Sequence, residues 1–442
     1  MKGNNLKVIR FVARRVHGHY NFDFEFNPDV TFLVGINGSG KTSALRLMQA
    51  AISCDLSTLC AIRFSELHIA VERDRLQKLS IFNEGSSLRF ELNGDEANTK
   101  VLLLSDDERS MYQKSGRLVE YMEEIRLKFL KDAGEPFRRF ANGPRPLFLG
   151  LERRMGRYDD ETFYYPEDEM AMRAMRTHSR PFGEFVEGID HCKILIERAY
   201  RQFRRSSDMN NSRLINVIVE STFDYIEFDP TWVSAKNSYL ELQSLVTRRK
   251  EIERFARELG GGDKASSQIG GFFSRISDIL NDAAGKKNDA LHLELLLNKA
   301  QIQRIHKILA EMDRQKKMAE RYYAPIKSVT DALNEFFSQS NKTVEIDSVG
   351  RIKVSHAGNP IPLEHLSSGE KQLLILLTHA RFSRNRGGAF IVDEPELSLH
   401  MRWQEMLVDG LLDGGPSNNQ FIFATHSPEI VGYRKHSCIR VD

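Results

Sequence analysis

Two motifs near opposite ends of the chain constrain its fold more than any other feature. The first, residues 35–42, reads Gly-Ile-Asn-Gly-Ser-Gly-Lys-Thr, and the second, residues 366–370, reads Leu-Ser-Ser-Gly-Glu. Each is a glycine-containing loop before a helical pattern of apolar residues, where backbone N–H groups can hold an anion. Residues 43–365 separate them. A fold that uses both motifs must therefore join the two ends of the chain in one unit and accommodate a long insertion.

The first motif has the pattern of a phosphate-binding loop, with two glycines separated by four residues and followed by Lys41 and Thr42. The apolar run 30–34 predicts a buried strand before it, and the apolar spacing over 42–52 predicts a helix after it. The glycines let backbone N–H groups turn toward phosphates, Lys41 supplies a positive charge, and the Thr42 hydroxyl is a ligand for Mg²⁺. The candidate nucleotide-binding residues are Asn37, Gly38, Ser39, Gly40, Lys41, Thr42 and Ser43.

A pair of acids follows another apolar run. Residues 389–392 predict a buried strand, and Asp393 and Glu394 come directly after it. Asp393 can hold Mg²⁺ at the strand end, and Glu394 can polarise an attacking water. The alternative is an acid that caps a helix, but the phosphate-binding loop favours the metal interpretation. His426 follows the predicted strand 420–424, so we expect it at the same edge of the sheet.

The second motif supports two compatible interpretations. Ser367 and Glu370 have the spacing of a capping box at the start of an apolar helix. With Gly369 beside it, the same helix N-terminus is also an anion site, with the Ser367 hydroxyl and backbone N–H groups facing outward.

The composition is that of an ordinary globular protein. Among 442 residues, 41% are apolar and 28% charged, and Lys plus Arg (63) nearly balance Asp plus Glu (61), so no global charge drives the chain onto nucleic acid or a membrane. No apolar run is long enough for a membrane helix, and the start lacks a secretory signal. The four cysteines lack the paired spacing of a zinc site. We therefore expect free thiols and a cytoplasmic location.

The fold class expected is α/β with a helical insertion, in three parts: 1–150, 151–340 and 341–442. Further strands are predicted over 7–12, 21–26, 64–71, 76–82 and 88–92, and as a hairpin of 343–346 and 351–354 around Gly350. Helical patterns cover 106–131, 184–336 with interruptions at Gly260–Gly262 and Gly270–Gly271, and a segment from about Met401. Ile302, Ile305, Leu309 and Met312 fit either a short coiled-coil seam or a plain amphipathic helix.

The order of these motifs resembles that of ABC-type ATPases. Residues 35–41 and the long insertion look like the SMC, Rad50 and RecF branch, with an antiparallel lobe in the nucleotide-binding head. Residues 394–400, Glu-Pro-Glu-Leu-Ser-Leu-His, are similar to the corresponding segment of OLD-like ATPases of the AAA_15 and AAA_21 types and of those in anti-phage systems such as PARIS and Septu. The resemblance covers residues 1 to about 105 and about 340 to 442.

The resemblance implies a role for each motif residue, with ATP and Mg²⁺ as substrate and cofactor. Thr42 and Asp393 would bind the metal, Glu394 would be the catalytic base, and His426 would sense the γ-phosphate. Residues from another copy of the chain would complete each site. These are Leu366, Ser367, Ser368, Gly369 and Glu370 of the signature motif, and Ser398, Leu399 and His400 of the D-loop. A glutamine loop is not recognisable, and Glu152 is the candidate substitute.

Two functions follow from this resemblance. In the first, a slow ATPase serves as the sensor or scaffold of a prokaryotic anti-phage system. It would form head dimers or higher homo-oligomers, control a separate effector such as a nuclease and respond to a phage trigger. Only 16 residues follow His426, too few for the Toprim nuclease of OLD enzymes, so we expect the effector to be another polypeptide. The alternative is a DNA-repair ATPase of the RecF or Rad50 kind that clamps a duplex.

Arginine clusters allow a DNA contact without requiring one. Residues 138–157 contain six arginines, and Arg201, Arg204 and Arg205 form a second group. Such clusters can meet phosphate backbones or form solvated helix faces paired with nearby acids, and we favour the second reading. DNA is therefore a possible but not a favoured partner, and no membrane partner is expected.

Overall fold

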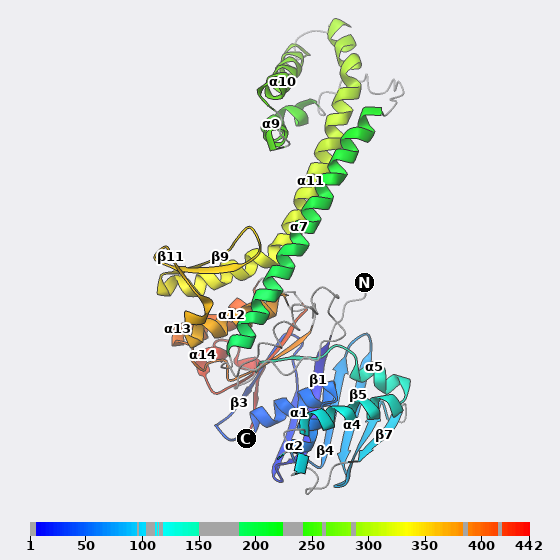
Figure 1. Ribbon diagram of the computed structural model, residues 1–442, viewed down its shortest axis with the longest axis vertical. Helices are drawn as coiled ribbons and strands as arrows, with labels where there is room; N and C mark the ends of the chain where they lie inside the picture. Colours follow the sequence, from blue (N-terminus) through cyan, green and yellow to red (C-terminus); the bar gives the residue numbers. More distant parts are fainter. Residues whose placement is uncertain are drawn as a thin grey trace. The chain divides into compact units, whose positions relative to one another are not determined.

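The computed structural model describes residues 6–94, 97–102, 111–112, 114, 118–149, 185–223, 242–258, 262–283, 289–382, 388–413 and 418–442. The chain divides into two compact units. Met1–Tyr200 and Pro325–Asp442 form the first unit, here called the head, and Arg201–Ala324 form the second, here called the arm. Figure 1 shows elements from both ends of the chain, blue to cyan and orange to red, beside one another in the head. The α/β class with an antiparallel lobe and a helical insertion is confirmed.

A parallel sheet forms the centre of the head. In the described part of the chain it has five strands in the order β14-β3-β13-β12-β8, and every neighbouring pair is parallel. The bounds are β3 Val30–Val34, β8 Leu147–Leu149, β12 Ala389–Asp393, β13 Gln420–Thr425 and β14 Cys438–Arg440. Every residue of β12 and β13 is buried, which explains their continuous apolar runs. The carboxyl ends of β3, β12 and β13 meet at one edge of the sheet.

An antiparallel sheet forms the second layer of the head. Its described strands are β1 Lys7–Val16, β2 Tyr20–Glu25, β4 Glu66–Glu72, β5 Leu76–Asn83, β6 Ser87–Leu92 and β7 Ala97–Leu102, in the order β2-β1-β4-β5-β6-β7. The fully buried Gln420 joins the two sheets, because its amide donates to the carbonyls of Val8 and Asn27 at 2.8 Å and its oxygen accepts from Val8 N.

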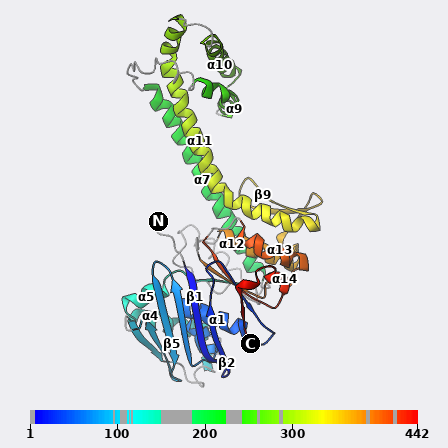
Figure 2. The same cartoon turned by 180° about the vertical axis from the view of Figure 1, so that it is seen from behind.

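Helices cover these sheets. On one face of the antiparallel sheet lie α1 Lys41–Ser53, α2 Leu56–Ala61, α4 Leu118–Asp132 and α5 Glu135–Ala141, and Figure 2 shows the opposite face. One apolar core of the head includes residues of α12 Ser368–Phe382, α13 Met401–Leu412, α14 Pro428–Val431, β9 Lys342–Ile346 and β10 Ile352–His356. A third strand, β11 Asn359–Ile361, pairs with β10 to complete a three-stranded sheet. Short 3-10 turns occupy Ser338–Ser340, Leu363–His365 and Lys435–Ser437.

The arm is helical over its described residues. Its elements are α9 Arg249–Glu258 and α10 Asp263–Ala283, with parts of α7 Phe185–Phe223 and α11 Asp289–Phe337. Within the arm, α7 and α11 run side by side (Figures 1 and 2), joined by the ion pair of Arg213 with Glu311 at 3.2 Å. The apolar seam that begins at Ile302 packs on α10 and on the segment before α9, which favours the plain amphipathic interpretation.

One expected helix break is wrong. Gly270 and Gly271 lie inside α10 rather than between helices. The neighbouring Phe273 and Ile276 are buried at 1% and 4% exposure, so packing of the apolar face outweighs the cost of about 1 kcal/mol for each glycine. Gly262 begins the described part of that segment, and residues 259–261 lie outside the described residues. None of the described helices combines the length and the apolar character that crossing a membrane requires.

Candidate functional site

The phosphate-binding loop connects the end of β3 to the start of α1, as the sequence indicates. Gly38 and Gly40 have φ angles of +89° and +86°, a conformation that favours glycine. A side chain at Gly40 would also lie 2.8 Å from the ring of Phe22. The loop therefore needs glycine at these positions to take its turn. Asn37 at its tip is exposed, and Ser43 in the first turn of α1 lies 3.0 Å from His17 Nε2.

Two polar side chains of the loop point inward. Lys41 is only 4% exposed, and its ammonium donates to the carbonyls of Gly35 and Ile36 at 2.8 and 3.2 Å. The Ser39 hydroxyl is buried and has no hydrogen-bond partner among the described residues. A buried hydroxyl without a partner is rare, because desolvation is then uncompensated. Both groups have the chemistry to bind an oxyanion placed in the loop.

Asp393 ends β12 beside this loop. Its side chain is buried at 3% exposure, and neither carboxylate oxygen accepts a hydrogen bond from a described residue. Burial raises the pKa of Asp393, whereas the Thr42 side chain and the positive charges of Arg46 and Lys41 act in the opposite direction. A buried carboxylate with unused oxygens and a neighbouring hydroxyl fits the oxygen ligands that Mg²⁺ prefers.

Glu394 and His426 contact each other at the same edge of the sheet. Glu394 has a φ of +50°, and its side chain is 11% exposed. Its carboxylate lies 2.6 Å from Nδ1 of His426, which follows β13. Burial and the negative charge of Glu396 raise the pKa of Glu394, and His426 opposes them. The sheet register therefore brings these two predicted residues together.

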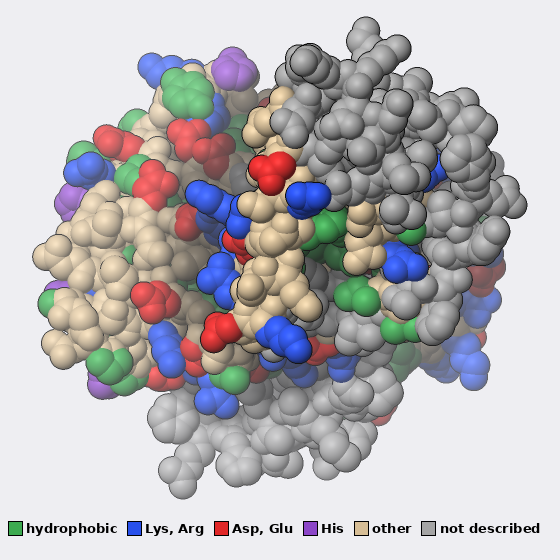
Figure 3. Space-filling model, turned by 90° about the horizontal axis from the view of Figure 1, so that it is seen from above, with side chains coloured by type: hydrophobic (Ala, Val, Ile, Leu, Met, Phe, Trp, Pro, Cys, Tyr) green, Lys and Arg blue, Asp and Glu red, His purple; other side chains and the backbone are tan. Residues whose placement is uncertain are grey.

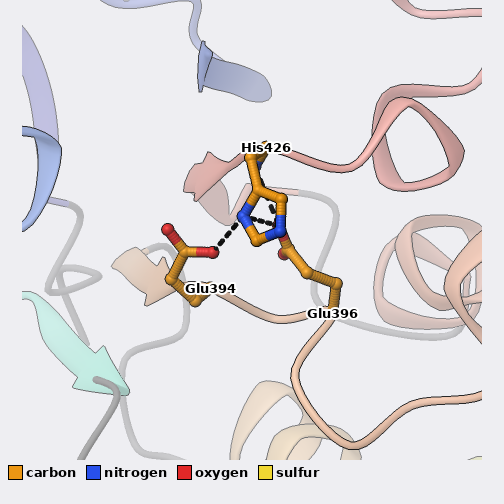
Figure 4. A group of neighbouring side chains, drawn as sticks. All are labelled: Glu394, Glu396 and His426. Carbon is orange, nitrogen blue, oxygen red and sulfur yellow. Dashed lines mark hydrogen bonds and ion pairs between the residues drawn. The ribbon is translucent and has the colours of Figure 1, made fainter. Parts of the chain in front are cut away.

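Glu396 is a third member of this group that the sequence analysis missed (Figure 4). Its carboxylate lies 3.1 Å from His426 Nδ1, so the imidazole nitrogen faces two carboxylates. One ligand atom from each of the three side chains lies within 4.8 Å of the others, a spacing that a metal ion could also use. The sequence offered one signal for Glu396, an acid three residues beyond Asp393. Its partners at the end of β13 are distant in the sequence, so they left no local pattern.

The signature motif has the capping geometry that the sequence predicts. Ser367 N donates to the Glu370 carboxylate at 2.8 Å, and Glu370 N donates to the Ser367 hydroxyl at 3.3 Å. Leu366 is buried, whereas Ser367 and Ser368 are exposed. Lys342 in β9, which the sequence analysis also missed, donates to both Glu370 oxygens at 2.7 and 2.8 Å. Burial raises the pKa of Glu370, but Lys342 and the Ser367 N–H outweigh it and lower the net pKa.

The D-loop packs against the signature motif of the same chain. A side chain on Gly369 would overlap the Ser398 carbonyl, which explains a glycine at this position. Ser398 has a φ of +65°, Leu399 is buried, and His400 caps the N-terminus of α13. No hydrogen bond joins residues 366–370 to residues 35–43 among the residues that the structure describes. Glu152, the proposed substitute for the glutamine loop, lies outside the described residues.

Comparison with known proteins gives a family match and a relative. Residues 213–432, about half of the chain, match the family model described as "AAA domain, putative AbiEii toxin, Type IV TA system". This span contains the signature motif, Asp393, Glu394 and His426. The "Retron Vc95 probable ATPase" of Vibrio cholerae serotype O1 biovar El Tor is 23% identical over an alignment of 266 residues, which covers 52% of this chain. The chain spans about half of that relative, 48% of its length.

Two solved structures are also similar over nearly the whole chain. One is the Smc head domain of Pyrococcus furiosus with an extended coiled coil, bound to the C-terminal domain of ScpA. It has a TM-score of 0.40, 12% identity and coverage of 98% of this chain and 93% of that one. The other is the Smc head domain of Pyrococcus yayanosii with a coiled coil and joint. It has a TM-score of 0.37, 14% identity and coverage of 98% and 95%.

Proposed function

We propose that the chain is a P-loop ATPase and that two copies join to form ATP-hydrolysing sites that act as a switch, a proposal that the phosphate-binding loop and the family match over residues 213–432 support. One observation supports the nucleotide site most directly. Asp393 is buried beside the phosphate-binding loop, and within the described residues its one neighbouring hydroxyl, that of Thr42, lowers its pKa without lying in full hydrogen-bond geometry. Burying a carboxylate without donors is costly, and a metal–phosphate complex at the loop would supply the missing charge.

The residues at this edge of the sheet have separate roles in the proposed mechanism. Thr42 and Asp393 would hold Mg²⁺, whose positive charge would offset that of the bound phosphates. Lys41, which contacts loop carbonyls in this structure, turns its ammonium toward the phosphates when ATP binds. Glu394 orients the attacking water and accepts its proton. His426 contacts the γ-phosphate and responds to its loss.

A second copy would complete each site. Ser367 and Ser368 are exposed at the start of α12. Within the described residues, residues 366–370 make no hydrogen bond to the phosphate-binding loop of their own chain, so they are available to a partner. The helix N-terminus and the serine hydroxyl suit the γ-phosphate held by the partner's loop. ATP would then join the two heads, and hydrolysis would release them.

We further propose that this switch is the sensor or scaffold subunit of an anti-phage defence system with a separate effector. The similarity to a retron's probable ATPase supports such a setting. The near balance of Lys plus Arg (63) and Asp plus Glu (61) favours a protein partner over DNA. In the face that Figure 3 presents, acidic and basic side chains of the described residues are interspersed, which does not match the single-sign surface that duplex DNA attracts.

The test is a pull-down of tagged Glu394→Gln protein from its native cell, after nuclease treatment of the lysate. This substitution removes the proposed base and retains the closed, ATP-bound form. A stoichiometric protein partner, above all a nuclease, would support the defence proposal. Recovery of the ATPase alone, with DNA present in the untreated control, would instead favour the DNA-clamp alternative. A steep loss of that DNA with added salt would strengthen it.

A further inference from the structure

Glu396 has hydrogen-bond partners that the ATPase mechanism described above does not explain. Its side chain is 5% exposed, and one oxygen accepts from the Thr425 hydroxyl at 2.7 Å and from the backbone N–H groups of His426 and Ser427 at 2.8 and 3.2 Å. The other oxygen is buried without a hydrogen-bond partner. Glu396 follows β12, whereas Thr425 ends β13 and His426 and Ser427 follow it, so this one carboxylate joins the ends of the two strands.

Among the described residues, one basic side chain lies within ion-pair distance of Glu396. That group is the His426 imidazole, with Nδ1 at 3.1 Å from the carboxylate. A buried carboxylate is costly unless donors or a cation compensate it. The donors from Thr425, His426 and Ser427 supply most of that compensation, and two of them come from backbone that a side-chain motion leaves in place.

The hydrogen-bond geometry fixes the orientation of the His426 ring. Both neighbours of Nδ1 are carboxylate oxygens, of Glu394 at 2.6 Å and of Glu396 at 3.1 Å. In the tautomer that carries its proton on Nδ1, the ring donates to the Glu394 carboxylate and leaves Nε2 for a ligand. The His426 side chain is 45% exposed, as a group that meets a ligand requires.

We propose that Glu396 is a positioning residue that holds His426 ready for the γ-phosphate while the ring exchanges its contact with Glu394. This inference rests on the proposed ATPase function. When ATP is bound, Glu394 must turn to the attacking water and lose its contact with the imidazole. Glu396 remains beside Nδ1 and holds the His426 backbone in place throughout this exchange. It also connects the D-loop, which begins two residues later at Ser398, to the residue that responds to the γ-phosphate.

A double-mutant cycle separates this role from a purely structural one. The variants are Glu396→Gln, His426→Ala and the double substitution, and the steady-state kcat and KM for ATP are measured for each. Gln keeps the amide oxygen as an acceptor for the three donors and removes the charge. We expect Glu396→Gln to lower kcat about tenfold with KM changed less than about twofold, and the double variant to match His426→Ala.

Two further variants make the test specific. Glu405→Gln, at an exposed glutamate on α13, is the matched control and should leave both constants unchanged. Thr425→Val removes one donor to Glu396 and keeps its charge. It should lower kcat by a smaller factor, again only when His426 is present. If Glu396→Gln fails to fold, the kcat of Thr425→Val still tests the positioning role.

The outcomes distinguish this inference from the function on which it rests. Losses in kcat that multiply in the double variant would overturn the positioning role and leave the ATPase function intact. An equal loss of nucleotide affinity and thermal stability in Glu396→Gln would also overturn it, because the residue would then act only as a structural connection. A wild-type protein that binds but does not hydrolyse ATP would refute the proposed function itself, and the inference with it.

Discussion

The ion pair beneath the signature motif gives the most quantitative prediction. Lys342 contributes two hydrogen bonds to Glu370, and the side chains are 18% and 3% exposed. Lys342→Met keeps the length and apolar stem of the side chain and leaves the carboxylate buried without its cation. Removing one partner of a buried pair costs about 3–5 kcal/mol, and we expect about 3 because Ser367 N and the Ser340 hydroxyl still donate to Glu370.

The loss of stability in Lys342→Met should depend on pH in a defined direction. The net pKa of Glu370 is lowered below its ordinary value of 4.5 in the folded head. A lowered pKa stabilises the fold at pH values above the unfolded pKa, and this stabilisation is lost as the pH falls through the folded pKa. Without Lys342, burial dominates and raises the pKa. The difference in free energy of unfolding between wild type and variant should therefore be largest near neutral pH and shrink below about pH 4.5.

Urea unfolding followed by circular dichroism at several pH values measures this difference. Lys353→Met is the matched control, because the ammonium of Lys353 in β10 is 65% exposed and pairs with Asp347 at 3.2 Å, so little change is expected. Adding Glu370→Gln to Lys342→Met should recover much of the lost stability, because Gln also completes a capping box and leaves no buried charge. A Lys342→Met protein as stable as wild type would refute this reasoning. A double variant less stable than Lys342→Met would refute it as well.

Three further substitutions test the nucleotide site. Lys41→Ala should abolish detectable binding of a fluorescent ATP analogue, and binding at wild-type affinity would exclude its role at the phosphates. Glu394→Gln should bind ATP, lower kcat by about 100-fold or more and enrich the dimer in size-exclusion chromatography with ATP; turnover at the wild-type rate would show that another group is the base. Gly369→Ala should collide with the Ser398 carbonyl, destabilise the protein by about 1–3 kcal/mol and reduce ATPase activity, whereas unchanged melting and turnover would contradict this packing.

The sequence predicted the elements whose signals are local. Strands β3, β12 and β13 are buried, mainly apolar runs, and their observed bounds lie within a residue of the expected ones. The capping box needs only two residues three positions apart. By contrast, β8 and β14 have three residues each, too few for a periodic pattern, and they become strands because neighbouring strands supply their partners.

The residues that support the site could not be found in this way. Glu396 binds Thr425 across 29 residues and Lys342 binds Glu370 across 28, so neither partnership leaves a local pattern. Gly270 illustrates the opposite error, since a local signal for a helix break was overridden by packing of the helix face. Motifs that act through their own backbone can be recognised in the sequence, whereas contacts between residues that only the folded sheet brings together cannot.

Subunit complementation tests the shared ATP site most directly. Lys41→Ala protein lacks the phosphate-binding lysine but keeps the signature motif, whereas Ser367→Arg protein has the reverse defect. Each alone should be inactive. Mixed one to one, they should regain about one quarter of the wild-type ATPase rate, because random pairing puts half of the dimers in the mixed form and each has one intact site of two. An inactive mixture in which mixed dimers demonstrably form, or full activity of Ser367→Arg alone, would contradict a site shared between two copies.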